Sequence, residues 1–105
     1  MKINRFKKNG YSSEVAKRYV EDKDIYFVSS FPEVQFKYEN DKRTNEITGY
    51  KYYFLQEGFN PFIIKFEDEI KELPPFLSKV TIENLEGIEI RSNVYFKAQS
   101  ITVVK

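Results

Sequence analysis

Apolar and polar residues alternate with a period of two along much of this chain, and no other feature limits its fold as strongly. The alternation appears in residues 25–27, 34–39, 49–56, 62–67 and 94–98. Because successive side chains of a β-strand point to opposite faces, this period predicts strands that bury one face. The chain is therefore predicted to be mainly β.

The segments between these runs predict one helix and a further strand. The acidic residues 67–69 precede the apolar Ile70 and Leu73, and acids in a first turn favour a helix through its macrodipole. The pair Pro74-Pro75 ends or kinks that helix. Alternation then returns over residues 79–91, with an interruption at 84–87, and predicts the fourth strand.

The predicted order of elements is three strands, a helix and two strands. This is the layout of an OB-fold, a five-stranded Greek-key barrel. Residues 24–105 are expected to form the barrel, with a bend at Pro32 in the first strand and a long polar loop over 39–48. Residues 1–23 are expected to form a basic N-terminal extension, whose short helix starts at Ser12 or Ser13.

Charge is unevenly distributed, although the net charge of the 105 residues is only +1. Residues 1–23 carry +4 and the remainder carries −3. A basic arm of this kind can contact phosphates or simply remain solvated. No apolar run is long enough for a membrane span and no hydrophobic signal region follows Met1, so a cytoplasmic protein is expected.

The composition argues against an enzyme. The chain has no His and no Cys, which removes the commonest general base, thiol nucleophile and metal ligands. Its four Gly residues cannot assemble a phosphate-binding glycine signature. The acidic cluster 67–69 is best explained as a helix N-terminus. No catalytic residue, metal, cofactor or small-molecule substrate is therefore expected.

The positive signal is a set of aromatic residues interleaved with cations. Strand parity sends Tyr50, Tyr52 and Phe54 inward together with Phe62, Ile64 and Phe66. The opposite parity leaves an exposed face of Lys37, Lys51, Tyr53, Lys65, Tyr95 and Lys97. Rings on such a face can stack on bases while ammonium groups contact phosphates.

The two loops that rim the binding groove of an OB-fold add further cations. The loop between the first two strands contains Lys42 and Arg43, and the loop between the last two contains Arg91. The acids Glu33, Glu39, Asp41 and Glu46 lie near the same groove and oppose a polyanion. Binding is therefore expected to be moderate and salt-sensitive.

Three segments carry a resemblance to a known class of proteins. Residues 49–55 (GYKYYFL), 60–66 (NPFIIKF) and 93–98 (NVYFKA) resemble small OB-fold single-stranded-DNA-binding proteins of Gram-positive plasmids, phages and other mobile elements. The resemblance covers residues 24–105. It implies handling of DNA strands during replication or transfer of such an element.

The function predicted from the sequence is binding of single-stranded DNA with little sequence preference. Tyr53 and Tyr95 are assigned to stacking, and seven cations to phosphate contacts: Lys37, Lys42, Arg43, Lys51, Lys65, Arg91 and Lys97. RNA remains an alternative ligand, because 2′-hydroxyl contacts depend on geometry. The second alternative is an interaction or structural barrel that binds a protein partner or forms a homodimer through exposed edge strands.

Overall fold

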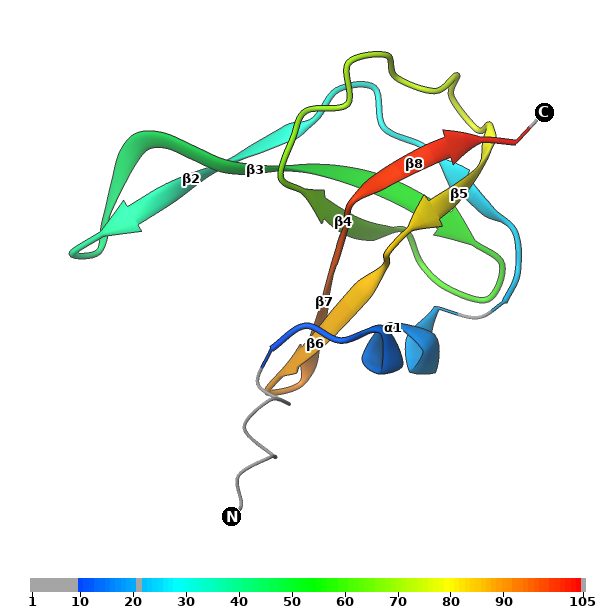
Figure 1. Cartoon of the computed structure of the whole chain (residues 1–105), viewed down its shortest axis with the longest axis horizontal. Coiled ribbons are helices and arrows are strands. Elements are labelled where there is room, and N and C mark those ends of the chain that lie inside the picture. The colour runs from blue at the N-terminus through cyan, green and yellow to red at the C-terminus, as the bar shows by residue number, and fades with distance from the viewer. Residues whose placement is uncertain (1–9, 21, 105) are drawn as a thin grey trace.

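The longest strand of the molecule lies at the centre of its sheet and has neighbours on both sides. The computed structural model describes residues 10–20 and 22–104, and within these ranges the chain forms one helix and eight strands (Figure 1). The elements are α1 (Ser13–Tyr19), β1 (Ile25–Phe27), β2 (Glu33–Glu39), β3 (Lys42–Gln56), β4 (Phe62–Phe66), β5 (Lys79–Glu83), β6 (Glu86–Ile90), β7 (Asn93–Ala98) and β8 (Ser100–Val103). The prediction of a mainly β chain is confirmed.

The sheet has the order β6-β7-β4-β3-β1-β5-β8, and β2 pairs with β3 outside this path. Neighbouring strands run antiparallel, except that β4 and β7 are parallel. The last four strands form one interrupted hairpin, in which β6 pairs with β7 and β5 pairs with β8. This hairpin reaches both edges of the central strands, because β7 joins β4 and β5 joins β1.

The prediction of a five-stranded closed barrel is wrong, because the sheet is open and has eight strands in the described residues. The first predicted strand is divided into β1 and β2 by the segment that contains Ser29 and Pro32, where the Ser29 hydroxyl accepts a hydrogen bond from the Tyr53 N–H. The final hairpin is interrupted where Asn84 has a φ of 56° and its side-chain amide donates to the Gln99 side chain.

The predicted helix between the third and fourth strands is also absent. Residues 67–78 form bends and turns, although Ile70 and Leu73 still pack against the core. Only the seven residues 67–73 precede Pro74, which is too short a segment for a helix without strong tertiary support. The Ile70 N–H instead donates to the Tyr52 hydroxyl at 2.9 Å, so this connection is held by a side chain of β3.

The predicted loop over residues 39–48 is mostly strand. β2 runs to Glu39 and β3 begins at Lys42, so that only Asn40 and Asp41 turn the chain. Both have positive φ, 51° and 64°, which is the backbone of a two-residue type I′ hairpin. As a result, β2 and the first part of β3 extend from the body as a hairpin arm, residues 33–48 (Figure 1).

The core confirms the predicted parity of the central strands. Tyr52, Phe54, Ile64 and Phe66 are buried together, and Tyr50 and Phe62 are half-buried against them. Their rings pack at tilted or edge-to-face angles, for example 72° between Tyr52 and Phe66. With these side chains inward, the intervening residues of β3 and β4 must face the other side of the sheet.

The predicted N-terminal helix is confirmed as α1, although it ends at Tyr19 rather than near Asp22. Ser12 is its N-cap and accepts a hydrogen bond from the Val15 N–H at 3.2 Å. Ala16 is buried where the helix lies against Gly87 of β6, and a Cβ at Gly87 would lie 3.2 Å from the Ala16 nitrogen. Residues 1–9 of the predicted basic extension lie outside the described residues.

Candidate nucleic-acid interface

A row of charged residues crosses five neighbouring strands. The register places Glu33 of β2 opposite Lys51 of β3, Lys51 opposite Lys65 of β4, and Lys65 opposite Lys97 of β7. Lys97 in turn lies opposite Glu86 of β6. The row therefore has three lysines in its centre and a carboxylate at each end.

Like charges directly opposite one another on neighbouring strands are destabilising. Lys51 and Lys65 make no ion pair with the described residues that could offset this repulsion, whereas Lys97 lies 3.8 Å from Glu86. An anion bound over the row would offset it. The three lysines therefore repel one another in the free protein, and a bound polyanion would reduce this repulsion.

Two predicted stacking residues lie on the same face as this row. Tyr53 is two residues after Lys51 in β3, and Tyr95 is two residues before Lys97 in β7. Tyr95 is 48% exposed and Tyr53 is half-buried. We call Lys51, Tyr53, Lys65, Tyr95 and Lys97 the cationic wall; the structure brings together these five of the nine predicted site residues.

A groove of about 410 Å³ runs over four of the five residues of the cationic wall, and the fifth, Lys97, lines an adjoining hollow. The lining of the groove comes from β2, β3, β4, β7, the turn before β4 and the segment before α1, and consists of Tyr11, Gln35, Lys51, Tyr53, Pro61, Phe62, Ile63, Lys65, Val94, Tyr95 and Phe96. Its floor is largely apolar or aromatic and its cations are lysines. This combination can accept the flat face of a base next to its phosphate.

Tyr11 is a site residue that the sequence did not reveal. The Lys97 Nζ lies 4.7 Å from the centre of the Tyr11 ring, which is within the range of a cation–π contact. Burial, followed by the nearby Tyr95, raises the pKa of the Tyr11 hydroxyl. The residue is placed there by the bridge between Ser12 and Gly87, a long-range pairing that no local pattern indicates.

Glu33 holds Tyr53 of the cationic wall in place, and its negative charge also disfavours a phosphate nearby. Its carboxylate accepts a hydrogen bond from the Tyr53 hydroxyl at 3.2 Å. The negative charge of Glu33 raises the pKa of Tyr53, because a tyrosinate beside it would be repelled. The same charge would repel a phosphate passing over that end of the row.

Lys65 depends on a glycine for its position. A Cβ at Gly49 would lie 2.6 Å from the Lys65 Cε and 3.1 Å from the Phe66 carbonyl oxygen. The aliphatic stem of Lys65 therefore crosses the backbone of β3 at the only kind of residue that leaves room for it. This contact holds the stem against the sheet.

A second hollow of about 540 Å³ adjoins the groove and shares Tyr11 and Lys65 with it. It is also lined by Lys97 and by the acids Glu67, Asp68 and Glu86. Its mixed charge makes it a poorer location for phosphates than the groove. The acids therefore limit the cationic surface on this side.

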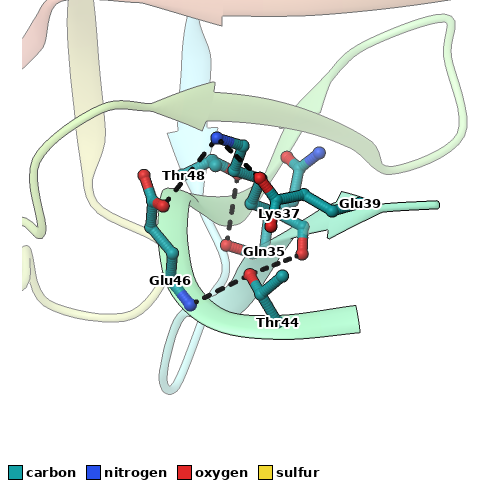
Figure 2. Close-up of polar contacts among 6 residues, drawn as sticks. All are labelled: Gln35, Lys37, Glu39, Thr44, Glu46 and Thr48. Carbon is teal, nitrogen blue, oxygen red and sulfur yellow. Dashed lines mark hydrogen bonds and ion pairs between the residues drawn. The ribbon is translucent and has the colours of Figure 1, made fainter. Parts of the chain in front are cut away.

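The predicted site residues of the hairpin arm lie apart from the groove. Figure 2 shows Lys37 between two carboxylates, with its Nζ 3.5 Å from Glu39 and 3.9 Å from Glu46. Arg43 places its guanidinium 4.8 Å from the centre of the Phe36 ring, and Lys42 is exposed next to the turn. None of these three lines the groove. The sequence predicts a loop at the rim of the groove, whereas these residues belong to a hairpin arm that extends away from it.

Arg91 is also separate from the groove. It lies in the two-residue turn between β6 and β7, with a φ of 59° and an exposed side chain.

Within the described part of the chain, no cluster of three or more carboxylate, His or Cys side chains could hold a metal ion. Over the same residues, no helix has the length and apolar character of a membrane span.

Searches against protein-family models, curated proteins and solved structures gave no match to this chain.

Proposed function

We propose that the cationic wall binds single-stranded DNA with little sequence preference. The observation that carries the proposal is the row of three lysines opposite one another on β3, β4 and β7, next to two accessible tyrosine rings. Lys51, Lys65 and Lys97 contact phosphates, and Tyr53 and Tyr95 stack on bases. Handling of DNA strands in a mobile element is the role that the sequence resemblance implies for such binding.

The shape of the site favours single strands over a duplex. The groove has an apolar floor, to which unpaired bases can present their faces, whereas the bases of a duplex are already stacked. No side chain of the groove offers an Arg or Asn fork for reading a base edge, and Gln35 is the only amide in its lining. Recognition therefore rests on stacking and charge.

Fluorescence anisotropy of a labelled oligo-dT, with a duplex of equal length as competitor, tests the proposal. The wild-type protein should bind the oligo-dT at about 0.1 M salt, and the duplex should compete poorly. Replacing both Tyr53 and Tyr95 by Ala should weaken binding at least tenfold, since each stacked base contributes about 1–3 kcal/mol. An oligo-U of the same length tests RNA as the alternative ligand.

The matched control is Tyr19→Ala on α1, which removes an exposed tyrosine outside the groove. This variant should bind as the wild type does. Absence of wild-type binding, or an equal loss in the Tyr19 variant, would refute the proposal. Circular dichroism of each variant verifies that the fold is retained.

A further inference from the structure

One edge of β2 is unpaired among the described residues. Among these residues β2 pairs only with β3, and the hairpin arm carries it away from the body (Figure 1). The Gln35 and Lys37 carbonyls face β3, where they accept hydrogen bonds from Thr48 and Thr44 (Figure 2). Because backbone groups alternate in direction along a strand, those of Val34, Phe36 and Tyr38 point outward from the sheet.

This edge is also regular. The pairing of β2 with β3 shifts register twice, between Gln35 and Phe36 and between Phe36 and Tyr38. In both places the additional residues lie in β3, and β2 runs through seven residues without interruption. Bulges in an edge strand hinder pairing with another chain, but here they lie in the inner strand.

One face of the arm is apolar and exposed. Val34 is 40% exposed, Ile47 is 45% exposed and Tyr38 is 64% exposed. These side chains alternate along the arm with the polar Glu33, Gln35 and Lys37. Unpaired strand edges with apolar side chains tend to associate with other strands.

The charges of β2 select a partner strand with the same sequence. In an antiparallel pair centred on Gln35, Glu33 lies opposite the second copy's Lys37, and Lys37 lies opposite the second copy's Glu33. Val34 then lies opposite Phe36 twice, which is a favourable pairing of β-branched and aromatic side chains. Centring the pair on Phe36 would place Glu33 opposite Glu39, and centring it on Lys37 would place two lysines opposite each other.

We propose that this chain forms a two-fold dimer in which β2 pairs antiparallel with β2 of a second copy, with Gln35 at the axis. Val34 and Phe36 of each copy exchange the central backbone hydrogen bonds, because their N–H and C=O groups point outward. The proposal does not depend on the proposed DNA binding. The dimer would nevertheless place both cationic walls on the same side of a continuous sheet, because directly opposite residues of paired strands project from the same face.

A single cysteine at the axis tests the register, because the natural chain contains no Cys. Gln35→Cys would place two sulfurs across a non-hydrogen-bonded pair, whose Cα atoms lie about 4.5 Å apart, and this spacing is suitable for a disulfide. Mild oxidation should convert most of this variant to a covalent dimer. The control Lys37→Cys should remain monomeric on a non-reducing gel, because its two copies would be four residues, about 13 Å, apart along the strand.

Charge reversal tests the same contact without cross-linking. Sedimentation equilibrium should show that Glu33→Lys and Lys37→Glu each weaken wild-type dimerisation about tenfold or more, because each turns two opposite-charge pairs into like-charge pairs. The double variant Glu33→Lys/Lys37→Glu should dimerise more tightly than either single variant, because both opposite-charge pairs return. It should dimerise less tightly than the wild type, because the new carboxylate at position 37 lies beside Glu39 and Glu46. A wild-type protein that stays monomeric at high concentration would overturn the proposal. A double variant that dimerises no more tightly than the single variants, or cross-linking of Lys37→Cys in place of Gln35→Cys, would overturn it as well.

Discussion

At Tyr53, one contact positions an aromatic ring and also keeps a carboxylate beside the groove. The ring lies on the cationic wall because strand parity places it with Lys51 and Lys65, and this grouping was predictable from the sequence. The hydrogen bond to Glu33 was not predictable, since it joins two strands separated by a hairpin of unknown register. The position of Tyr11 was not predictable either, because it depends on the long-range bridge between Ser12 and Gly87.

Glu33→Gln should lower the pKa of Tyr53 toward its usual value of 10.0, because the carboxylate that repels a tyrosinate is removed. The titration can be followed by NMR of the labelled tyrosine Cζ. The variant should also bind oligo-dT about two- to fivefold more tightly, the effect of one exposed charge. Glu72→Gln in the 67–78 connection should change neither quantity. An unchanged Tyr53 titration would show that the two side chains are not in contact in solution.

At the scale of elements, the sequence predicted strands well and connections poorly. Period-two alternation depends on burial and is visible locally, so the strands of the core appear where they were expected. The two-residue turn at Asn40 and Asp41 is not evident from the sequence, because the polar residues of β3 that follow it are equally typical of a loop. The expected helix before Pro74 is absent because the seven residues 67–73 are too few to form a helix unaided. The Tyr52 hydroxyl, which accepts from the Ile70 N–H, holds this connection against β3 in its place.

Tyr52→Phe should reduce the free energy of unfolding by about 1–3 kcal/mol, because the Ile70 N–H loses its acceptor in a partly buried position. Urea denaturation measures this loss, and hydrogen exchange of the Ile70 amide should become faster. The control Tyr26→Phe removes the hydroxyl of a half-buried tyrosine, and this hydroxyl bonds to none of the described residues. An unchanged exchange rate at Ile70 would contradict the assigned role of Tyr52.

The same tyrosine predicts a pH dependence. Burial raises the pKa of Tyr52 above its value of about 10.0 in the unfolded chain, so the folded state retains the proton to higher pH. This contribution to stability is fully present below pH 10 and is lost as the pH rises through the raised pKa. Urea midpoints measured from neutral to alkaline pH should therefore fall more steeply for the wild type than for Tyr52→Phe. Parallel curves would contradict the shift.

At the scale of the whole molecule, the fold class was predictable and the closure of the sheet was not. The parallel pairing of β4 with β7 and the final hairpin that reaches both edges of the central strands are features that the order of elements alone does not specify. Closure of the sheet requires continuous pairing between strands that are distant in the sequence. Here the final hairpin is interrupted at Asn84 and Gln99, and this position follows only from the register of the paired strands. The cationic wall is independent of closure, because three neighbouring strands build it.

The number of lysines on the wall predicts the salt dependence of binding. If Lys51, Lys65 and Lys97 each neutralise one phosphate, a plot of log affinity against log salt should have a slope of about −2 on single strands. Lys51→Gln should reduce the magnitude of this slope by about 0.7. Lys17→Gln on α1, which also removes an exposed lysine, should leave the slope unchanged. Equal effects of both variants would indicate that the charge of the whole molecule, rather than the wall, governs binding.

The most direct test of the cationic wall is an NMR titration of the isotopically labelled protein with unlabelled oligo-dT. Amide shifts should be largest in residues 51–53, 63–65 and 95–97, which are the segments of β3, β4 and β7 that carry the wall. Shifts concentrated on β5, β8 or the far side of α1, or the absence of shifts on these three segments at saturation, would contradict the account.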